Sequence, residues 1–504
     1  MIPVDAAPEE ATAVRTFLQE SGFTERVLCD RLGIPDIYHF APVFLGRPPL
    51  TGTRDAVDLL IRLFLDSEAV EPATVERFIP AKVLTAMRGL GLLRSGEGST
   101  VEATVLLYPT ESLYIVSDQP RGPATGESAV SDAVYPAVTL SAKHFVTAIP
   151  RSSVERLLEL CSGTGIGALV ASRTAGQAWA VDITERSTRF ARFNAVLNGI
   201  DRVTALQGDL YEPVAGRTFD RILAHPPYVQ STETREIYRD GGVDGERLTR
   251  AVIQGLPDHL APGGQLYCQC TLADREGASL EERVRDWLGS ASGQFDVFIF
   301  TLGTLDPYRA LYDEALRGRT TLEETRRREA IYRDMSIQEL VYCTLVIQRV
   351  RAARPVMNVR RLRGEETDGD ALEWLMRWET ASRGAAAEDP LDGAVVTVSP
   401  HVRSVWGRTL SGGRWVTEHT TLETEWPFPN RIQCAPWLVD YLESCDGSRT
   451  VQEDFRALRD AGILAADVTE TAFGTLIQSL VAAGVLLLPT FPLPPRPGHV
   501  PTGE

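Results

Sequence analysis

The sequence predicts an α/β fold built on a mostly parallel sheet, and three observations carry this prediction. An apolar run at 157–161 is followed by Gly163, Gly165 and Gly167 and then by a helix-like segment. A buried strand, a glycine-rich turn and a helix N-terminus in this order let backbone approach a ligand closely. Three further apolar runs follow before residue 228, each ending in polar residues. Because the carboxyl ends of parallel strands meet at one edge, we expect the four ends to line one crevice.

The ends of the second, third and fourth runs carry candidate ligand residues. AWAVD ends in Asp182, where such folds place an acid against ribose hydroxyls. VTALQGD ends in Asp209, and FDRILAHPPY ends in the His-Pro-Pro-Tyr sequence at 225–228. The glycine spacing is Gly-x-Gly-x-Gly and not the Gly-x-Gly-x-x-Gly of pyrophosphate binding, so a nicotinamide-dependent oxidoreductase is the weaker alternative.

Taken together, these motifs resemble a class I S-adenosylmethionine-dependent methyltransferase. The motifs are Glu-Leu-Cys-Ser-Gly-Thr-Gly at 159–165, Asp182, Gly208-Asp209 and Pro-Pro-Tyr at 226–228. With the segment GGVDGERLTRAVIQGLPDHLAPGG, the His-Pro-Pro-Tyr sequence is similar to the branch that contains the release-factor glutamine N-methyltransferases. That branch has Asn-Pro-Pro-Tyr where this chain has His225. The resemblance covers about residues 154–349, and its motifs are specific for the cofactor and not for the acceptor.

The resemblance implies a Rossmann-like sheet that binds S-adenosylmethionine. Glu159 and the backbone around Gly163 and Gly165 would meet the methionine portion, and Asp182 would bind both ribose hydroxyls. Asp209 would accept from the adenine amino group. The full set of expected cofactor-binding residues is Glu159, Cys161, Gly163, Thr164, Gly165, Asp182, Ile183, Asp209, Leu210 and His225.

The resemblance also implies that His225, the Pro226 carbonyl and the Tyr228 ring hold a nitrogen acceptor, either a guanidine, an amine or an amide. An imidazole with a pKa near 6.5 can accept a hydrogen bond or take the proton itself, so both roles of His225 stay open. The preferred acceptor is a small nitrogenous metabolite. The alternative is a glutamine-like side chain of a protein or peptide that the terminal modules grip. A nucleic acid is a less favoured acceptor.

Composition places the chain among ordinary multidomain soluble proteins. It has 504 residues, of which 43% are hydrophobic and 24% charged, and this length suggests about three domains. The formal net charge of -17 disfavours nucleic acid as the main partner. No signal peptide and no run near ~18 apolar residues is seen, so we expect a cytoplasmic protein without membrane contact.

The seven cysteines have no framework spacing, so we expect free buried thiols and no metal site. Cys268 and Cys270 form a Cys-x-Cys pair that would share one face of an apolar strand. No second pair of cysteines or histidines stands nearby, and core packing is therefore favoured over metal binding.

Flanking segments suggest additional domains. The expected divisions are a helical, winged-helix-like domain at 1–120, a segment covering the pocket at 121–150, the methyltransferase domain at 151–350 with a helical insertion at 305–340, an α+β domain at 351–488, and a disordered proline-rich tail at 489–504. The end of the α+β domain resembles winged-helix-like modules that recognise leader peptides, and a packing or homodimer-forming module is the alternative. A regulatory scaffold that uses both ends to bind macromolecules is a further alternative for the whole chain.

Two segments beside the pocket have weaker signals. The polar, glycine-containing stretch 230–246 predicts a mobile loop across the pocket mouth. Its candidate substrate contacts are Glu233, Arg235, Glu236, Arg239 and Asp240. His144 in the covering segment could touch the site, but an isolated histidine is more often structural.

Overall fold

The computed structural model describes residues 7–40, 50, 52–119, 131–230, 237–316, 320–365, 367–383 and 389–496. The chain divides into two compact units. Unit 1 contains residues 1–297 and 304–351, and unit 2 contains residues 298–303 and 352–504.

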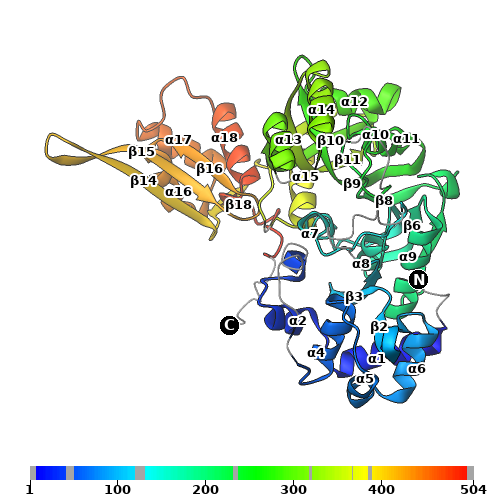
Figure 1. Ribbon diagram of the computed structural model, residues 1–504. Helices are drawn as coiled ribbons and strands as arrows, with labels where there is room; N and C mark the ends of the chain where they lie inside the picture. The colour runs from blue at the N-terminus through cyan, green and yellow to red at the C-terminus, as the bar shows by residue number, and fades with distance from the viewer. Residues whose placement is uncertain are drawn as a thin grey trace. The chain divides into compact units, whose positions relative to one another are not determined.

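A mixed sheet forms the centre of unit 1 (Figure 1). Its strands are β5 (Val154–Leu160), β6 (Ala175–Asp182), β7 (Val203–Gln207), β8 (Phe219–Ala224), β9 (Leu260–Arg275), β10 (Phe295–Leu305) and β11 (Ile337–Arg349). They lie in the order β10-β11-β9-β8-β5-β6-β7. The strands from β5 to β9 pair in parallel, and β11 runs antiparallel to β9. The prediction of a mostly parallel α/β sheet is confirmed.

The order of the strands reverses at β5, which places the crevice. β6 and β7 lie on one side of β5, and β8 and β9 on the other. Leu157, Leu158 and Leu160 of β5 are fully buried, because helices cover both faces of such a sheet and its central strands read as continuous apolar runs. Ligands bind outside the carboxyl ends of the strands at a reversal of this kind, here the ends of β5 and β8.

Helices connect the strands of the sheet. They are α8 (Ile166–Ala171), α9 (Glu185–Asn198), α10 (Arg247–Gln254), α11 (Leu256–His259) and α12 (Leu280–Leu288). A further helix, α7 (Leu140–Thr147), lies before β5 and contacts α8 and β9. The segment expected to cover the pocket therefore contains a helix, while its residues 120–130 lie outside the described part of the chain.

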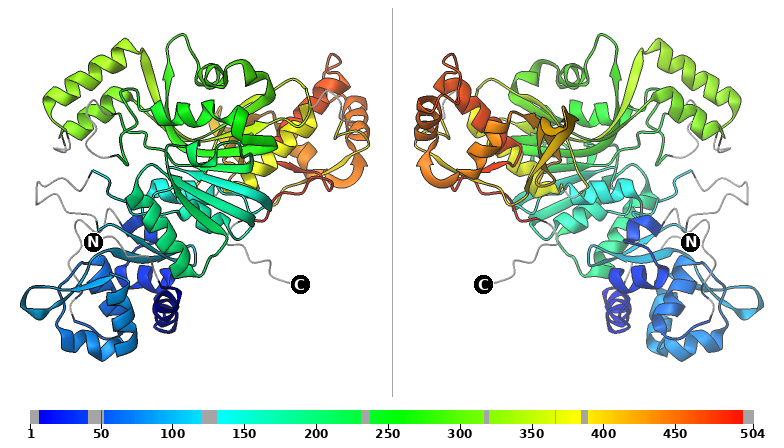
Figure 2. Two further views of the ribbon diagram at one scale, coloured as in Figure 1. Left: turned by 90° about the vertical axis from the view of Figure 1, so that its right-hand side faces the viewer. Right: turned by 90° about the vertical axis from the view of Figure 1, so that its left-hand side faces the viewer.

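Two helices occupy the interval in which the sequence predicts a helical insertion. α13 (Pro307–Leu316) and α14 (Leu322–Asp334) pack on each other and on β11. Figure 2 shows the pair, in lime green, standing away from the body of the sheet. Leu311, Tyr332 and Ile337 form a small buried cluster with Ala273, which anchors the pair to the long strands.

The N-terminal region is helical with two short hairpins. Its elements are α1 (Pro8–Glu20), α2 (Glu25–Leu32), α4 (Ala56–Leu60), η2 (Ile61–Leu65), α5 (Pro72–Phe78), α6 (Ala81–Gly89), β1 (Leu93–Ser95), β2 (Val101–Ala103), β3 (Leu106–Thr110) and β4 (Leu113–Ser117). The strands β1 and β2 have three residues each, too few to leave an alternating pattern in the sequence. A winged helix stays a prediction for this region.

Two asparagines of α9 join the N-terminal hairpin to the sheet domain. Asn194 Oδ1 accepts from Val116 N at 2.8 Å, and Asn194 Nδ2 donates to Val116 O at 3.0 Å. Asn198 pairs in the same way with the N–H and C=O of Tyr114, both at 2.8 Å. Residues four apart on a helix share a face, so these amides satisfy the edge of β4 as a neighbouring strand would. Asn194 Nδ2 also donates to the Thr164 carbonyl at 3.0 Å, inside the glycine-rich turn.

Unit 2 contains two small antiparallel sheets and four longer helices. Its elements are β12 (Asn358–Leu362), which pairs with β10, α15 (Gly369–Arg383), β13 (Val395–Val398), β14 (Val402–Ser411), β15 (Arg414–Thr424), β16 (Asn430–Cys434), α16 (Pro436–Glu443), β17 (Asp446–Thr450), α17 (Val451–Asp460), α18 (Glu470–Ala482) and β18 (Leu486–Leu487). The hairpin of β14 and β15 turns at Gly412 and Gly413. A winged-helix-like end stays a prediction.

The proline-rich tail differs from the expected disorder as far as residue 496. Phe491 packs on Trp374 and Trp378 of α15, with ring centroids 5.9 and 5.4 Å away. Burial of this large ring holds the first part of the tail, and residues 497–504 lie outside the description. Within the described residues no helix is both long and apolar enough to span a bilayer.

Replacing Asn194 by alanine is expected to destabilise unit 1. The side chain is fully buried, so the change leaves the Val116 N–H and the Val116 and Thr164 carbonyls without these partners. Each buried unpaired group costs about 1–3 kcal/mol, and we expect a loss of about 3–5 kcal/mol in the free energy of unfolding, measured by urea denaturation. The partly buried Asn198, changed to alanine, is the matched control and should cost less; equal stability of wild type and Asn194→Ala would contradict the bridging role.

Candidate active site

The glycine-rich turn between β5 and α8 adopts backbone conformations that glycine permits. Gly163 and Gly165 have φ of 51° and 77°, in the left-handed region. A Cβ on Gly165 would lie 2.9 Å from the Cβ of Ala191, whereas a Cβ on Gly163 would meet open space. Ser162 Oγ in the same turn is buried and has no hydrogen-bond partner among the described residues. The turn thus combines an open side at Gly163 with an unsatisfied polar atom.

The Glu159 side chain fixes the backbone of this turn through hydrogen bonds. Its two carboxylate oxygens accept from Gly167 N at 2.9 Å and Ala168 N at 2.8 Å, the free N–H groups at the start of α8. The side chain is buried, and burial raises its pKa to about 8 despite the two bonds. The resemblance implies that Glu159 meets the methionine portion of the cofactor. In the structure both oxygens accept from backbone N–H groups, so Glu159 shapes the turn, and its contact with the cofactor stays a prediction.

Asp182 lies at the end of β6 and is tied to the same turn. One oxygen accepts from Gly163 N at 2.9 Å, and the other accepts from the N–H and hydroxyl of Thr184 at 3.1 and 3.2 Å. Asp182 also has a hydrogen bond with the Ser187 side chain, so the present bonds account for about all four acceptor positions of the carboxylate. The expected pair of bonds to two ribose hydroxyls would therefore require one of the present bonds to be shared. Burial is the largest influence on the pKa of Asp182 and raises it.

The end of β7 offers a different environment. Asp209 is exposed, and its carboxylate makes no hydrogen bond among the described residues. Leu210 beside it has φ of 45°, and Ile183 after β6 is 50% exposed. An available carboxylate and exposed apolar side chains are thus found together at the ends of adjacent strands.

His225 and Tyr228, which follow β8, are held by one serine. Ser141 Oγ of α7 lies 2.7 Å from His225 Nε2 and 2.8 Å from Tyr228 Oη. The Phe145 ring stacks on His225 with centroids 5.3 Å apart. Burial lowers the pKa of His225 to about 4, so the expected pKa near 6.5 is corrected and the imidazole is uncharged at neutral pH. Pro226, which lies between His225 and Tyr228 in the sequence, is buried.

The loop that follows His-Pro-Pro-Tyr is folded against it over its described part. Gly241 N donates to Val229 O at 2.8 Å, and Val229 N donates to Arg239 O at 3.0 Å. A Cβ on Gly245 would lie 2.9 Å from the Tyr228 carbonyl oxygen, and Gly245 has φ of 72°. Gly241 and Gly245 thus lie close against Tyr228, and the mobility that the sequence predicts for this loop stays a prediction. Glu233, Arg235 and Glu236 lie outside the described residues.

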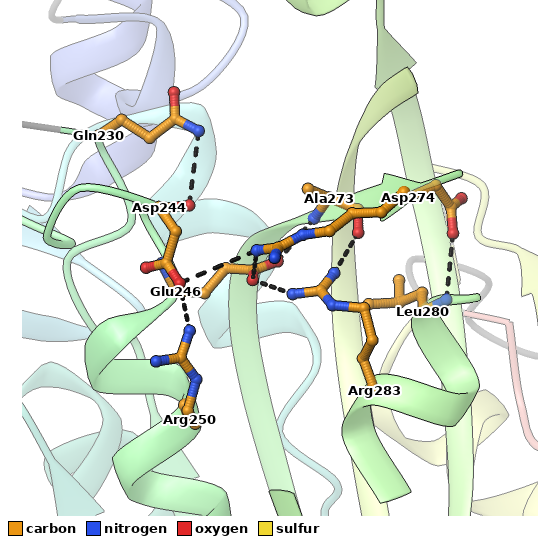
Figure 3. A network of polar contacts seen from close by, with 9 residues as sticks. Gln230, Asp244, Glu246, Arg250, Ala273, Asp274, Leu280 and Arg283 are labelled. Carbon is orange, nitrogen blue, oxygen red and sulfur yellow. Dashed lines mark hydrogen bonds and ion pairs between the residues drawn. The ribbon is translucent and has the colours of Figure 1, made fainter. Parts of the chain in front are cut away.

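A buried ion-pair network, which the sequence does not predict, secures the end of this loop (Figure 3). Glu246 is 1% exposed and accepts from Ala273 N and from Arg275, each at 2.8 Å, and also from Arg283. Asp244 pairs with Arg250. A buried carboxylate needs such partners, because an unpaired charge in the interior is strongly disfavoured. No local pattern distinguishes Glu246 from a surface glutamate.

Two of the candidate substrate contacts, Arg239 and Asp240, lie in the same loop. Asp240 is buried and accepts from Gly242 N at 2.8 Å, which gives it a structural role in the turn. The Arg239 carbonyl pairs with Val229.

Cys268 and Cys270 are fully buried in β9. Among the residues that the structure describes, no three His, Cys, Asp or Glu side chains are grouped to hold a metal ion.

The part of the chain that contains this site is similar to known proteins. Residues 136–285 match the family model described as the methyltransferase small domain. The ribosomal protein uL3 glutamine methyltransferase of Bradyrhizobium diazoefficiens is 33% identical over 172 residues, 31% of this chain and 53% of that protein. The release factor glutamine methyltransferase of Thermodesulfovibrio yellowstonii is 30% identical over 127 residues, 23% of this chain and 46% of that protein.

The chain spans about half the length of these curated relatives. The matched region contains α7, the glycine-rich turn, Asp182, Asp209 and the His-Pro-Pro-Tyr sequence. Residues 136–285 therefore form a class I S-adenosylmethionine-dependent methyltransferase domain, of the branch that includes the glutamine N-methyltransferases of release factors and ribosomal proteins.

Proposed function

We propose that this chain transfers a methyl group from S-adenosylmethionine to the side-chain amide nitrogen of a glutamine in a protein. The observation that carries the proposal is that Ser141 holds His225 and Tyr228 together at the end of β8, next to β5 and its glycine-rich turn. The relatives are named for glutamine methylation of a ribosomal protein and a release factor. Their names favour the protein acceptor over the small metabolite.

The residues at the ends of β5, β6 and β7 fit S-adenosylmethionine. The unsatisfied Ser162 hydroxyl and the exposed Asp209 carboxylate suit a ligand rich in hydroxyl and amino groups, and Asp182 would bind such a ligand by sharing or exchanging one of its present bonds. Ile183 and Leu210 provide apolar surface for the adenine ring. Because a nearby positive charge stabilises ionised carboxylates, the buried Asp182 also favours a cationic ligand.

When bound, S-adenosylmethionine supplies a methyl carbon already activated by its positively charged sulfur. The protein has mainly to align the acceptor nitrogen with that carbon and to exclude water. In the proposed complex His225 Nδ1 and the Pro226 carbonyl accept from the acceptor N–H groups, and the Tyr228 ring packs on their plane. The stacked Phe145 covers His225 and excludes water from this corner.

A carboxamide suits a neutral His225 better than a charged acceptor. An ammonium or guanidinium group must lose a proton before it can attack, and a base with a pKa of about 4 cannot remove that proton efficiently. A carboxamide is uncharged and planar, and it presents two N–H donors. The amine and guanidine acceptors that the sequence leaves open are therefore less well supported.

Replacement of Asp182 is expected to weaken S-adenosylmethionine binding. Loss of a hydrogen bond to a charged group costs about 1.5–3 kcal/mol, so Asp182→Ala should raise the dissociation constant about 10- to 100-fold in titration calorimetry. Asp182→Asn keeps the size and one acceptor oxygen, and it should give an intermediate value in a folded protein. Asp201→Ala, an exposed acid before β7, is the control. Wild-type affinity in both Asp182 variants would refute the assignment.

The acceptor class can be tested with a bacterial extract and S-adenosylmethionine that carries an isotope-labelled methyl group. We expect the label in the protein fraction, on glutamine side chains, after proteolytic digestion and mass spectrometry. The His225→Ala variant should incorporate much less label. Label in the small-molecule fraction, or on lysine or arginine, would replace the carboxamide by another acceptor.

The His225 ring is expected to stay neutral from pH 8 down to about pH 5. Burial lowers its pKa to about 4, so protonation should begin only in the acid range. The measurement is ¹⁵N NMR of protein labelled at histidine, and the signal missing from His225→Asn provides the assignment. A titration of this signal near pH 6.5 would show that the ring is solvated and available as an ordinary base.

A further inference from the structure

A continuous set of polar side chains leads away from His225. Ser141 Oγ joins His225 Nε2 at 2.7 Å to Tyr228 Oη at 2.8 Å. The Tyr342 hydroxyl of β11 hydrogen-bonds to Tyr228, with ring centroids 6.2 Å apart. His144 Nδ1 lies 3.3 Å from Tyr342 Oη. Two imidazoles are thus connected through three hydroxyl groups.

We propose that Ser141, Tyr228 and Tyr342 form a hydroxyl relay that carries the proton released by the methyl acceptor from His225 to His144. The proposal rests on the proposed function for the existence of a nitrogen acceptor at His225. It adds Ser141, Tyr342 and His144 to the residues that take part in methyl transfer.

The reaction requires a path for one proton. When the acceptor nitrogen bonds to the methyl carbon, the carbon–sulfur bond breaks and its electron pair stays on sulfur, while the nitrogen releases one proton. His225 Nδ1 makes no hydrogen bond with the described residues and can take this proton. The proton on Nε2 then passes to Ser141 Oγ, and each hydroxyl passes its own proton to the next group until His144 Nδ1 is protonated.

Ser141 is suited to this transfer because a hydroxyl has one hydrogen and two neighbours here. It either donates to His225 Nε2 and accepts from Tyr228, or accepts from His225 Nε2–H and donates to Tyr228. Reversal between these two arrangements exchanges the tautomer of His225 and moves one proton along the chain. The two distances, 2.7 and 2.8 Å, are those of short hydroxyl hydrogen bonds.

The burial of His225 and Tyr228 explains why a relay is needed. His225 is uncharged with a pKa of about 4, so it does not retain a proton and must pass it on. Burial raises the pKa of Tyr228, so this hydroxyl keeps its hydrogen and can donate it while accepting another. His144, at the far end of the relay, is half-buried.

Helix α7 carries two members of the relay: Ser141, its first hydroxyl, and His144, its final proton acceptor. Ser141, His144 and Phe145 are three and four residues apart, so they share one face of the helix. Thr139 caps the helix by accepting from Ala142 N at 3.2 Å, which sets where this face begins. A single helix thus contacts His225 directly and receives the proton at the other end.

The relay is tested with Ser141→Ala, Tyr342→Phe and the double variant. Each single change should lower kcat about 10-fold or more, since general acid–base contributions are typically larger than this, and should leave S-adenosylmethionine affinity unchanged in calorimetry. The double variant should be no slower than the slower single variant, because both changes interrupt one path. Thr85→Ala removes an exposed hydroxyl that donates to the Ala81 carbonyl within α6 and is the control, with wild-type kcat.

A second measurement needs no acceptor. In the free protein, ¹⁵N NMR of the His225 ring should show a change in the protonated nitrogen between wild type and Ser141→Ala, and no change in Thr85→Ala. An unchanged tautomer, or additive losses of kcat in the double variant, would overturn the relay. Failure to find a glutamine acceptor would instead overturn the proposed function and leave the tautomer result standing.

Discussion

The buried carboxylate of Glu159 sets the position of the glycine-rich turn. It accepts the N–H groups of Gly167 and Ala168 at the start of α8. Gly167 lacks a side chain of necessity, because its Cβ would lie 2.6 Å from the Glu159 oxygen. With α8 fixed, Gly163 N points at Asp182, and the ends of β5 and β6 share one geometry. The glycine-rich turn of the candidate cofactor site is thus held by the two buried hydrogen bonds of Glu159.

The histidine at position 225 imposes a second constraint. An asparagine side chain carries its donor and acceptor on one amide, whereas an imidazole directs its two nitrogens in different directions. If one nitrogen faces the acceptor, the other needs a partner inside the protein. Ser141 supplies that partner and Phe145 covers the ring, so His225 and α7 form one functional group. Histidine in place of the asparagine of Asn-Pro-Pro-Tyr is thus accompanied by Ser141 and Phe145, two contacts from outside the motif.

The parts of the site that the sequence predicts are those marked by local patterns. Apolar runs that end in Asp182, Asp209 and His225 indicate strand ends, and parallel topology brings such ends together. Ser141 lies 84 residues from His225 in a segment without clear periodicity, so no local pattern marks it. Asn194 left a weak signal, because a polar residue on the buried face of a helix requires hydrogen-bond partners. The pKa of His225 depends on burial by distant segments and is invisible to motif matching.

The N-terminal region belongs to the site structurally, whatever else it does. Asn194 binds both Val116 of the N-terminal hairpin and the Thr164 carbonyl in the glycine-rich turn. Arg186, at the start of α9, also pairs with Asp118 just beyond that hairpin. A shift of the hairpin would therefore be transmitted to the turn through α9. This coupling gives the N-terminal helices a role in shaping the pocket that needs no DNA binding, in agreement with the acidic net charge.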